Sequence, residues 1–146
     1  MKTLLIASDH AGVDLKNQIL SEKSLFGEWK DLGPFSKDSV DYPDFADAVA
    51  RLIHQNPEEK AILICGSGQG MAIRANKYPN VRAALGYNED ITKLSRQHNN
   101  ANILCLGARF LNFDQAQKII KIFFETPFEG GRHQGRVDKL SKKIVD

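Results

Sequence analysis

Residues 61–76, AILICGSGQGMAIRAN, decide the fold of this chain. They begin with an apolar run, residues 61–65, that is too continuous for a half-exposed strand and fits a strand buried on both faces of a sheet. A glycine-rich loop at 66–70 follows, and Met71 then begins a segment with the pattern of a helix. A buried strand, a tight glycine turn and a helix start are together typical of a parallel α/β sheet.

The same stretch has the features of an anion-binding site beside a reactive thiol. Backbone N–H groups of the loop and of the helix start would point at one place, where the helix dipole favours negative charge. Cys65 lies at the rim of that place. A structural explanation competes with this one, because glycines after a strand often serve only a tight turn and cysteine is commonly buried. The stretch alone leaves both explanations open.

Further strands are expected on both sides of this stretch. Apolar segments predict strands at 3–8, 81–85 and 103–106, and residues 28–32 give a weaker strand pattern. Amphipathic segments with helical periodicity separate these strands. This alternation predicts a single α/β domain with three layers, in which helices cover both faces of a five-stranded, doubly wound parallel sheet. The dinucleotide-binding fingerprint is absent after the first expected strand, and there is no Walker motif. The fold class is therefore one that often binds nucleotides, but the nucleotide signals are missing.

Length and composition restrict the class of protein. The 146 residues suffice for one domain with a full core, and 42% apolar with 26% charged residues is ordinary for a globular protein. The net charge of +2, from 20 basic and 18 acidic residues, does not favour nucleic acid as a partner. No apolar run is long enough to cross a membrane, and the apolar segment 1–7 is cut off at Ser8-Asp9-His10, too early for a signal peptide. The sequence predicts a cytoplasmic protein with neither membrane nor nucleic acid as a partner.

The two cysteines are predicted to be free thiols. Cys65 and Cys105 fall in different expected strands, and one further strand is expected to lie between them. Two strand spacings amount to ~10 Å, more than the ~7 Å separation of Cα atoms that a disulfide tolerates. No spacing of Cys and His residues suggests a zinc site.

Polar residues near the first two predicted helices are candidates for ligand contacts. Asp9 and His10 follow the first strand at its carboxyl end, where open α/β sheets bind ligands. Asp9 could instead be a plain helix N-cap, and His10 an exposed loop residue. Tyr42 begins the helix after the loop at 33–41. Its ring could pack on the helix end, or its hydroxyl could reach the site.

The later part of the chain supplies a histidine and a pair of arginines. His98 lies one turn beyond the apolar face of the helix at 89–98, where a lone histidine is usually structural. Arg132 and Arg136 share a helix face directly after a Gly-Gly pair, which suits bidentate binding of a phosphate. This helix is expected over about 132–144. Its apolar stripe could pack on the domain or on another subunit, and consists of Val137, Leu140 and Ile144.

Five motifs, in order over nearly the whole chain, resemble those of the ribose-5-phosphate isomerase type B family. That family also includes the galactose-6-phosphate isomerase subunits. The motifs are Ser-Asp-His-Ala-Gly at 8–12, Asp-Tyr-Pro at 41–43, Ile-Cys-Gly-Ser-Gly-Gln-Gly at 64–70, Ser-Arg-Gln-His-Asn at 95–99 and Glu-Gly-Gly-Arg-His-Gln-Gly-Arg at 129–136. The resemblance implies a Rossmann-like sheet in a homodimer or homotetramer, with sites shared between two subunits.

The resemblance also implies a role for each matching residue. Cys65 would be the base that carries a proton between C1 and C2 of the open-chain sugar, with Ser67 beside it, and His98 would assist opening of the sugar ring. The other residues would bind the substrate: Gly66, Gly68, Gln69 and Gly70 the enediolate oxygens, Asp9, His10, Tyr42 and Asn99 the sugar, and Arg132 and Arg136 the phosphate, with Arg109 nearby.

Two positions depart from the family pattern. Many relatives that use a thiol have Thr in place of Ser67, and serine keeps the hydroxyl. Other relatives lack the cysteine and have Glu directly after the glycine loop. Here that position is Met71, which cannot act as a base, so Cys65 has no visible competitor.

Isomerisation of a sugar phosphate fits the chemistry of these residues. Proton abstraction next to a carbonyl needs a base and also stabilisation of the enediolate charge. A free thiol is only a few per cent thiolate at pH 7, and the helix start beside Cys65 is expected to raise that fraction. The sequence offers no site for a metal or a redox cofactor, and the reaction needs neither.

The sequence therefore predicts an aldose–ketose isomerase that interconverts ribose 5-phosphate and ribulose 5-phosphate in the pentose phosphate pathway. One alternative is the same reaction on a six-carbon 6-phosphate, such as allose or galactose 6-phosphate. The other is a non-catalytic protein that binds a sugar phosphate or a nucleotide. Such a protein would not need Cys65 beside the anion-binding loop.

Overall fold

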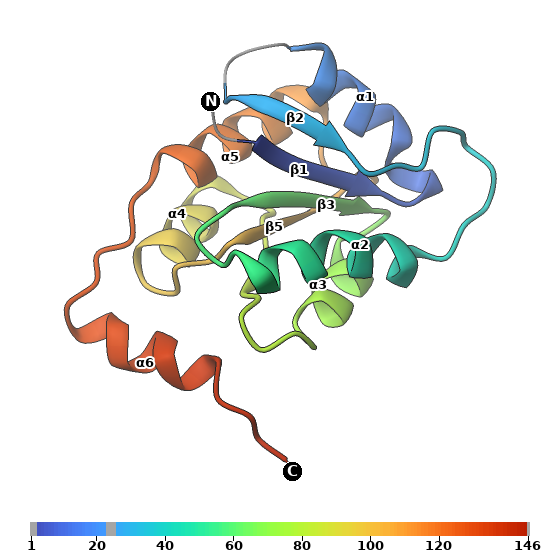
Figure 1. The fold of residues 1–146 in the computed structure, drawn as a ribbon. Helices are drawn as coiled ribbons and strands as arrows, with labels where there is room; N and C mark the ends of the chain where they lie inside the picture. Colours follow the sequence, from blue (N-terminus) through green and yellow to red (C-terminus); the bar gives the residue numbers. More distant parts are fainter. Residues whose placement is uncertain (1–2, 23–25, 146) are drawn as a thin grey trace.

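A parallel sheet is the centre of the computed structural model, which describes residues 3–22 and 26–145 (Figure 1). Its five strands lie in the order β2-β1-β3-β5-β4, and every pairing is parallel. The strands are β1 (Thr3–Ser8), β2 (Glu28–Asp31), β3 (Ala61–Cys65), β4 (Ala83–Leu85) and β5 (Ile103–Gly107). Met1 and Lys2, which begin the apolar N-terminal segment, lie outside the described residues. The predicted five-stranded parallel sheet is confirmed.

Helices cover both faces of this sheet, as predicted. They are α1 (Val13–Ser21), preceded by a 3-10 turn (His10–Gly12), α2 (Tyr42–Gln55), α3 (Gln69–Ala75), α4 (Glu89–Gln97), α5 (Phe113–Glu125) and α6 (Arg132–Leu140). One core cluster packs α2 and α3 against one face, and a second packs α1 and α5 against the other, with α4 beside α5. α6 extends away from the sheet on the side where the strands begin (Figure 1). None of the helices within residues 3–22 and 26–145 is long and apolar enough to cross a membrane.

β3 lies in the middle of the sheet because its residues are apolar on both faces. All of them are buried, and alternate residues enter the two core clusters: Leu63 and Cys65 one cluster, Ile62 and Ile64 the other. β3 pairs with β1 on one side and with β5 on the other. The loop that follows β3 therefore lies at the centre of the carboxyl edge of the sheet, where ligands bind in folds of this kind.

Cys65 and Cys105 lie on neighbouring strands, so the expectation of a strand between them is wrong. β5 pairs directly with β3, and the short β4 takes the edge position, where it pairs with β5 alone. The register sets Cys105 opposite Leu63 and Cys65 opposite Gly107, so the two thiols are offset by two residues along the strands. Both cysteines are free, as predicted.

α6 is shorter than expected. It ends at Leu140, where the Ser141 and Lys142 N–H groups bond to carbonyls three residues back. Only Val137 of the predicted apolar stripe is buried, whereas Leu140 is 59% exposed and Ile144, beyond the helix, is 95% exposed. Leu140 and Ile144 therefore leave most of their side-chain surface uncovered by their own domain.

A buried ion pair, which the sequence pattern did not reveal, fixes the loop after β2. Lys16 of α1 is fully buried, and its Nζ lies 2.8 Å from both carboxylate oxygens of Asp31 and 2.8 Å from the Pro34 carbonyl oxygen. Asp31 also accepts a hydrogen bond from the Gly33 N–H at 2.8 Å. These bonds hold the start of the loop between β2 and α2 against α1.

Candidate active site

Three loops meet at the carboxyl edge of the sheet, after β1, β3 and β5. Backbone hydrogen bonds join them: the Asp9 N–H donates to the Ile64 carbonyl at 3.0 Å, and the Ala108 N–H to the Cys65 carbonyl at 2.9 Å. The Arg109 N–H donates to the Gly66 carbonyl at 3.1 Å. The loop after β3 is thus held between the other two, and residues from all three can face one ligand.

Cys65 ends β3 and is almost fully buried, at 4% exposure. The Gly68 N–H donates to its Sγ at 3.1 Å, a contact that stabilises negative charge on sulfur. This turn requires glycine, because Gly68 has a φ of +80° and a Cβ there would lie 3.2 Å from the carbonyl carbon of Leu106. The local sequence therefore aims a backbone donor at the thiol.

Ser67 and Gln69 form the exposed rim of the same loop. The Ser67 Oγ accepts a hydrogen bond from the Gln69 N–H at 3.3 Å, and both side chains are exposed. The hydroxyl of Ser67, two residues after Cys65, is therefore held within the loop while it stays open to a ligand.

Tyr42 and Arg109 pack directly on the glycine loop. Tyr42 comes before the loop in the sequence and Arg109 after it. A Cβ at Gly70 would lie 2.5 Å from the Tyr42 ring, so only glycine lets the ring approach. A Cβ at Gly66 would lie 3.1 Å from the guanidinium carbon of Arg109. The start of α2 and the loop after β5 thus bring a phenol and a cation to the loop that carries Cys65.

Asp9 and His10 complete this edge, and both make structural hydrogen bonds. The Asp9 carboxylate accepts from the Ala11 N–H at 2.9 Å and the Gly12 N–H at 3.3 Å, so it caps the 3-10 turn before α1. His10 Nδ1 accepts from the Val40 N–H at 3.2 Å, which joins the loop before α2 to the site. The Nε2 atom of His10 takes no part in that bond.

The remaining predicted residues lie at the opposite edge of the sheet. α4 runs back along the sheet, and His98 and Asn99 follow its last residue shortly before β5 begins at Ile103. Arg132 and Arg136 lie on α6, on the same side of the molecule (Figure 1). Within one chain, the structure does not bring these four residues to Cys65.

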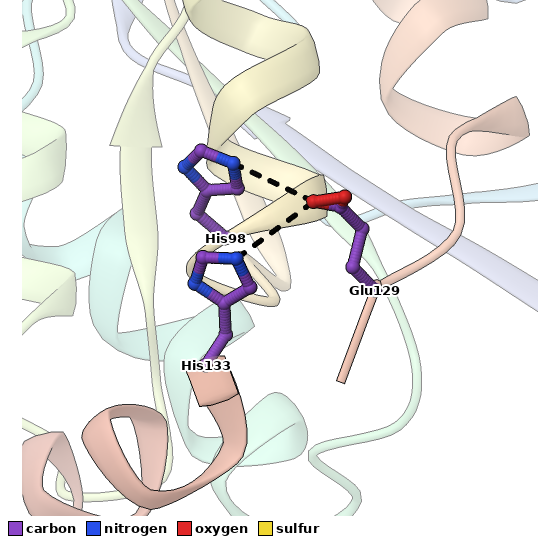
Figure 2. Close-up of side chains that lie close together, drawn as sticks. All are labelled: His98, Glu129 and His133. Carbon is purple, nitrogen blue, oxygen red and sulfur yellow. Dashed lines mark ion pairs between the residues drawn. The ribbon is translucent and has the colours of Figure 1, made fainter. Parts of the chain in front are cut away.

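A second histidine, His133, forms a cluster with His98 and Glu129 (Figure 2). The two imidazole rings stack with centroids 4.3 Å apart and planes 13° apart. The Oε1 atom of Glu129 lies 3.5 Å from His98 Nε2 and 3.7 Å from His133 Nε2. Burial lowers the pKa of His133, as do the neighbouring His98 and Arg132. Sequence reasoning gave Glu129 and His133 no role, and the only signal for them was their place in the motif at 129–136.

The identity of these three side chains would suit a metal ion, but the orientation of the rings does not. The ligand atoms of His98, Glu129 and His133 all lie within 4.8 Å of one another. Because the rings are nearly parallel, the in-plane lone pairs of the two Nε2 atoms run side by side and do not converge on one point. The arrangement instead places one carboxylate between two possible proton carriers.

Arg96 ties this cluster to the rest of the domain. Its buried guanidinium donates to the Thr126 carbonyl at 3.1 Å, the Asn100 Oδ1 at 2.9 Å and the Ala101 carbonyl at 2.6 Å. Burial lowers the pKa of Arg96 to about 10. The Glu129 N–H also donates to the Gln97 carbonyl at 3.1 Å. The end of α4 and the segment before α6 are therefore one fixed unit.

Known proteins share both the sequence and the fold of this chain. The family model described as ribose/galactose isomerase matches residues 4–140. The chain belongs to the ribose/galactose isomerase family. The probable ribose-5-phosphate isomerase B of Mycoplasma genitalium is 46% identical in an alignment of 141 residues that covers 94% of this chain and 92% of that protein.

Two solved structures show how closely the family fold is kept. Ribose-5-phosphate isomerase B of Clostridium thermocellum has a TM-score of 0.92 and 41% identity, over 96% of this chain and 95% of that one. Ribose-5-phosphate isomerase B of Mycoplasma genitalium, with bound ribulose-5-phosphate, has a TM-score of 0.88 and 44% identity, over 95% of this chain and 93% of that one. The expected family and its fold are confirmed, and the chain is an isomerase.

Proposed function

We propose that this isomerase interconverts ribose 5-phosphate and ribulose 5-phosphate. The main support is the contact between the Gly68 N–H and Cys65 Sγ at 3.1 Å, in a loop on which Tyr42 and Arg109 also pack. A base with a backbone donor on it, beside further loop N–H groups, suits removal of a proton next to a carbonyl. The relative with bound ribulose-5-phosphate supports the choice of substrate.

Cys65 carries the proton between the two carbons. Its thiolate takes the proton from C2 of open-chain ribose 5-phosphate, and the electron pair moves to O1 to give the enediolate. Backbone N–H groups of the loop at 66–70 stabilise this charge, and each such donor is typically worth about 3 kcal/mol of barrier. The Ser67 hydroxyl passes the hydroxyl proton from O2 to O1. Cys65 then returns its proton to C1, which completes the ketose.

Asp9, His10 and Tyr42 hold the sugar in this proposal, together with Gln69 of the loop. The support for these roles is their position, since they surround the loop that carries Cys65. Arg109 lies against Gly66 and supplies positive charge at the same edge.

A complete site needs a second copy of the chain in this proposal. The groups for ring opening and phosphate binding lie at the opposite edge from Cys65, and comprise His98, Asn99, Arg132 and Arg136. Large apolar side chains that are exposed in the single chain offer a surface for association, among them Phe110, Leu140 and Ile144. We infer a homodimer, or a homotetramer built from such dimers, in which each site combines the two edges of different subunits.

Incubation of the purified protein with ribose 5-phosphate and with allose 6-phosphate, followed by assay of the ketose, tests the proposal. We expect rapid formation of ribulose 5-phosphate and slow or no reaction of the six-carbon sugar. Preference for allose or galactose 6-phosphate would favour the second candidate, which the description of the family as ribose/galactose isomerase keeps open. Binding without turnover of any of these sugars would contradict an isomerase role. The cytoplasmic location stays a prediction.

A further inference from the structure

Glu129 offers one carboxylate oxygen to two stacked imidazoles. Its Oε1 lies 3.5 Å from His98 Nε2 and 3.7 Å from His133 Nε2. Figure 2 shows both Nε2 atoms on the side of the rings that faces Glu129, while the other ring nitrogen of His98, Nδ1, lies on the far side. One carboxylate therefore faces two imidazoles, and either ring could present an Nε2–H to it.

Hydrogen bonds fix the backbone around Glu129. Its N–H donates to the Gln97 carbonyl at 3.1 Å, directly before His98, and the His133 N–H donates to the Gly130 carbonyl at 3.0 Å. Arg96 holds the carbonyl of Thr126, three residues earlier in the chain, at 3.1 Å. These bonds hold the backbone at Glu129 beside both rings, and its side chain, 47% exposed, reaches the two Nε2 atoms from there.

Glu129 lies between two imidazoles with different surroundings. The side chain of His133 is 9% exposed, and burial lowers its pKa, as do His98, Arg132 and Arg136, against the opposite effect of Glu129. The side chain of His98 is 39% exposed. Two stacked rings 4.3 Å apart cannot both be imidazolium cations without strong repulsion. His133 therefore packs against His98 as a neutral ring, and the Nε2 atom of His98, 3.5 Å from Oε1, is the nearer partner of Glu129.

We propose that Glu129 is a positioning residue for ring opening: it keeps a proton on His98 Nε2 and leaves Nδ1 free to work on the sugar. Nδ1 accepts the proton of the anomeric hydroxyl, the bond from C1 to the ring oxygen breaks as the C1 carbonyl forms, and the same proton is returned to the ring oxygen. Glu129 stabilises the imidazolium that exists between the two transfers. The inference rests on the proposed function, in which His98 assists ring opening.

Ring opening can be measured apart from isomerisation in the Cys65→Ala background. That variant lacks the base, but it should still open the ring, and opening and closing interconverts the α and β anomers of ribose 5-phosphate. Exchange between the two anomer signals by NMR gives the rate. We expect Cys65→Ala to raise the exchange rate above the rate in buffer alone. The acceleration by Cys65→Ala/Glu129→Gln should be at least about tenfold smaller. Binding of ribose 5-phosphate, measured by calorimetry, should change less than about twofold.

Glu125→Gln is the matched control, because Glu125 is an exposed glutamate four residues earlier and the change removes the same charge. It should leave exchange unchanged. Unaltered exchange in the Cys65→Ala/Glu129→Gln variant would overturn the positioning role. Loss of sugar binding together with exchange would overturn it too. Cys65→Ala protein that does not accelerate exchange would overturn it as well. Failure of the unaltered protein to isomerise ribose 5-phosphate would instead count against the proposed function.

Discussion

Cys65 and His98 lie at opposite ends of the strands of one parallel sheet. Cys65 ends β3, whereas His98 follows α4, which runs back to the edge where β5 begins at Ile103. A strand of five residues spans ~17 Å, which is more than one five-carbon sugar phosphate can bridge. A single subunit therefore holds the proposed base and the proposed ring-opening group apart, and two copies are needed to bring them to one substrate.

Replacing Cys65 by alanine should lower kcat for ribose 5-phosphate by at least about a thousandfold, because the base for proton transfer is lost. Sugar binding should remain, because the loop N–H groups and the arginines stay in place. Steady-state kinetics and calorimetry measure the two effects. Cys105→Ala is the control: Cys105 is buried inside β5, where burial raises its pKa and keeps it a neutral thiol, so the change should leave kcat nearly unaltered. Substantial turnover in Cys65→Ala would place the base elsewhere.

Replacing His98 by asparagine should impair use of the cyclic aldose, because ribulose 5-phosphate is already open whereas ribose 5-phosphate must be opened. The variant would depend on uncatalysed ring opening in solution. Its rate from ribose 5-phosphate should then stop rising as more enzyme is added, while its rate from ribulose 5-phosphate keeps rising in proportion. Initial rates over an about hundredfold range of enzyme concentration show the difference. Proportional rates in both directions would remove His98 from ring opening.

The stability of the protein should fall in mild acid through His133. Its pKa in the folded state lies below the ordinary 6.5, because burial and the neighbouring His98, Arg132 and Arg136 oppose the charge more than Glu129 favours it. The unfolded chain therefore takes up this proton first, so the free energy of unfolding is unaffected above about pH 6.5 and falls as the pH drops below it. Urea unfolding at pH 7.5 and 5.5 measures the loss. His133→Gln should lose less than the unaltered protein, and an equal loss would contradict this assignment.

Replacing Asp31 by asparagine should destabilise the fold by about 3–5 kcal/mol, because it leaves the buried ammonium of Lys16 without its charged partner. Chemical denaturation gives the value. The ion pair between Lys37 and Asp14 is a control from the same region, since both side chains are more than half exposed. Lys37→Gln should be close to neutral. Similar losses for both variants would mean that the burial of Lys16 has no special cost.

Much of the fold could be predicted from short-range patterns. The run at 61–65 is apolar on both faces, which only a central strand satisfies, and the structure buries all of it. The order of strands could not be read in the same way, because it depends on which edges pair. β4 has only three residues, all partly exposed, and it takes the edge beyond β5 instead of separating β5 from β3.

The site was predictable where it is local in sequence. The contact between Gly68 and Cys65 follows from the turn itself, whereas the cluster of His98, Glu129 and His133 joins segments that are some thirty residues apart. The burial of Lys16 was also invisible, because an isolated lysine on a helix gives no sign of its partner. Such long-range pairings depend on tertiary packing and not on periodicity.

The shared site is tested most directly by combining two defective subunits. Cys65→Ala and His98→Asn chains, co-expressed with different tags, give mixed dimers that two purification steps isolate. If each site takes Cys65 from one subunit and His98 from the other, one of the two sites in a mixed dimer is intact and the other lacks both groups. The mixed dimer should then turn over ribose 5-phosphate at about half the rate of the unaltered dimer, far above either parent. Mixed dimers no more active than the average of the two parents would contradict a site built from two subunits.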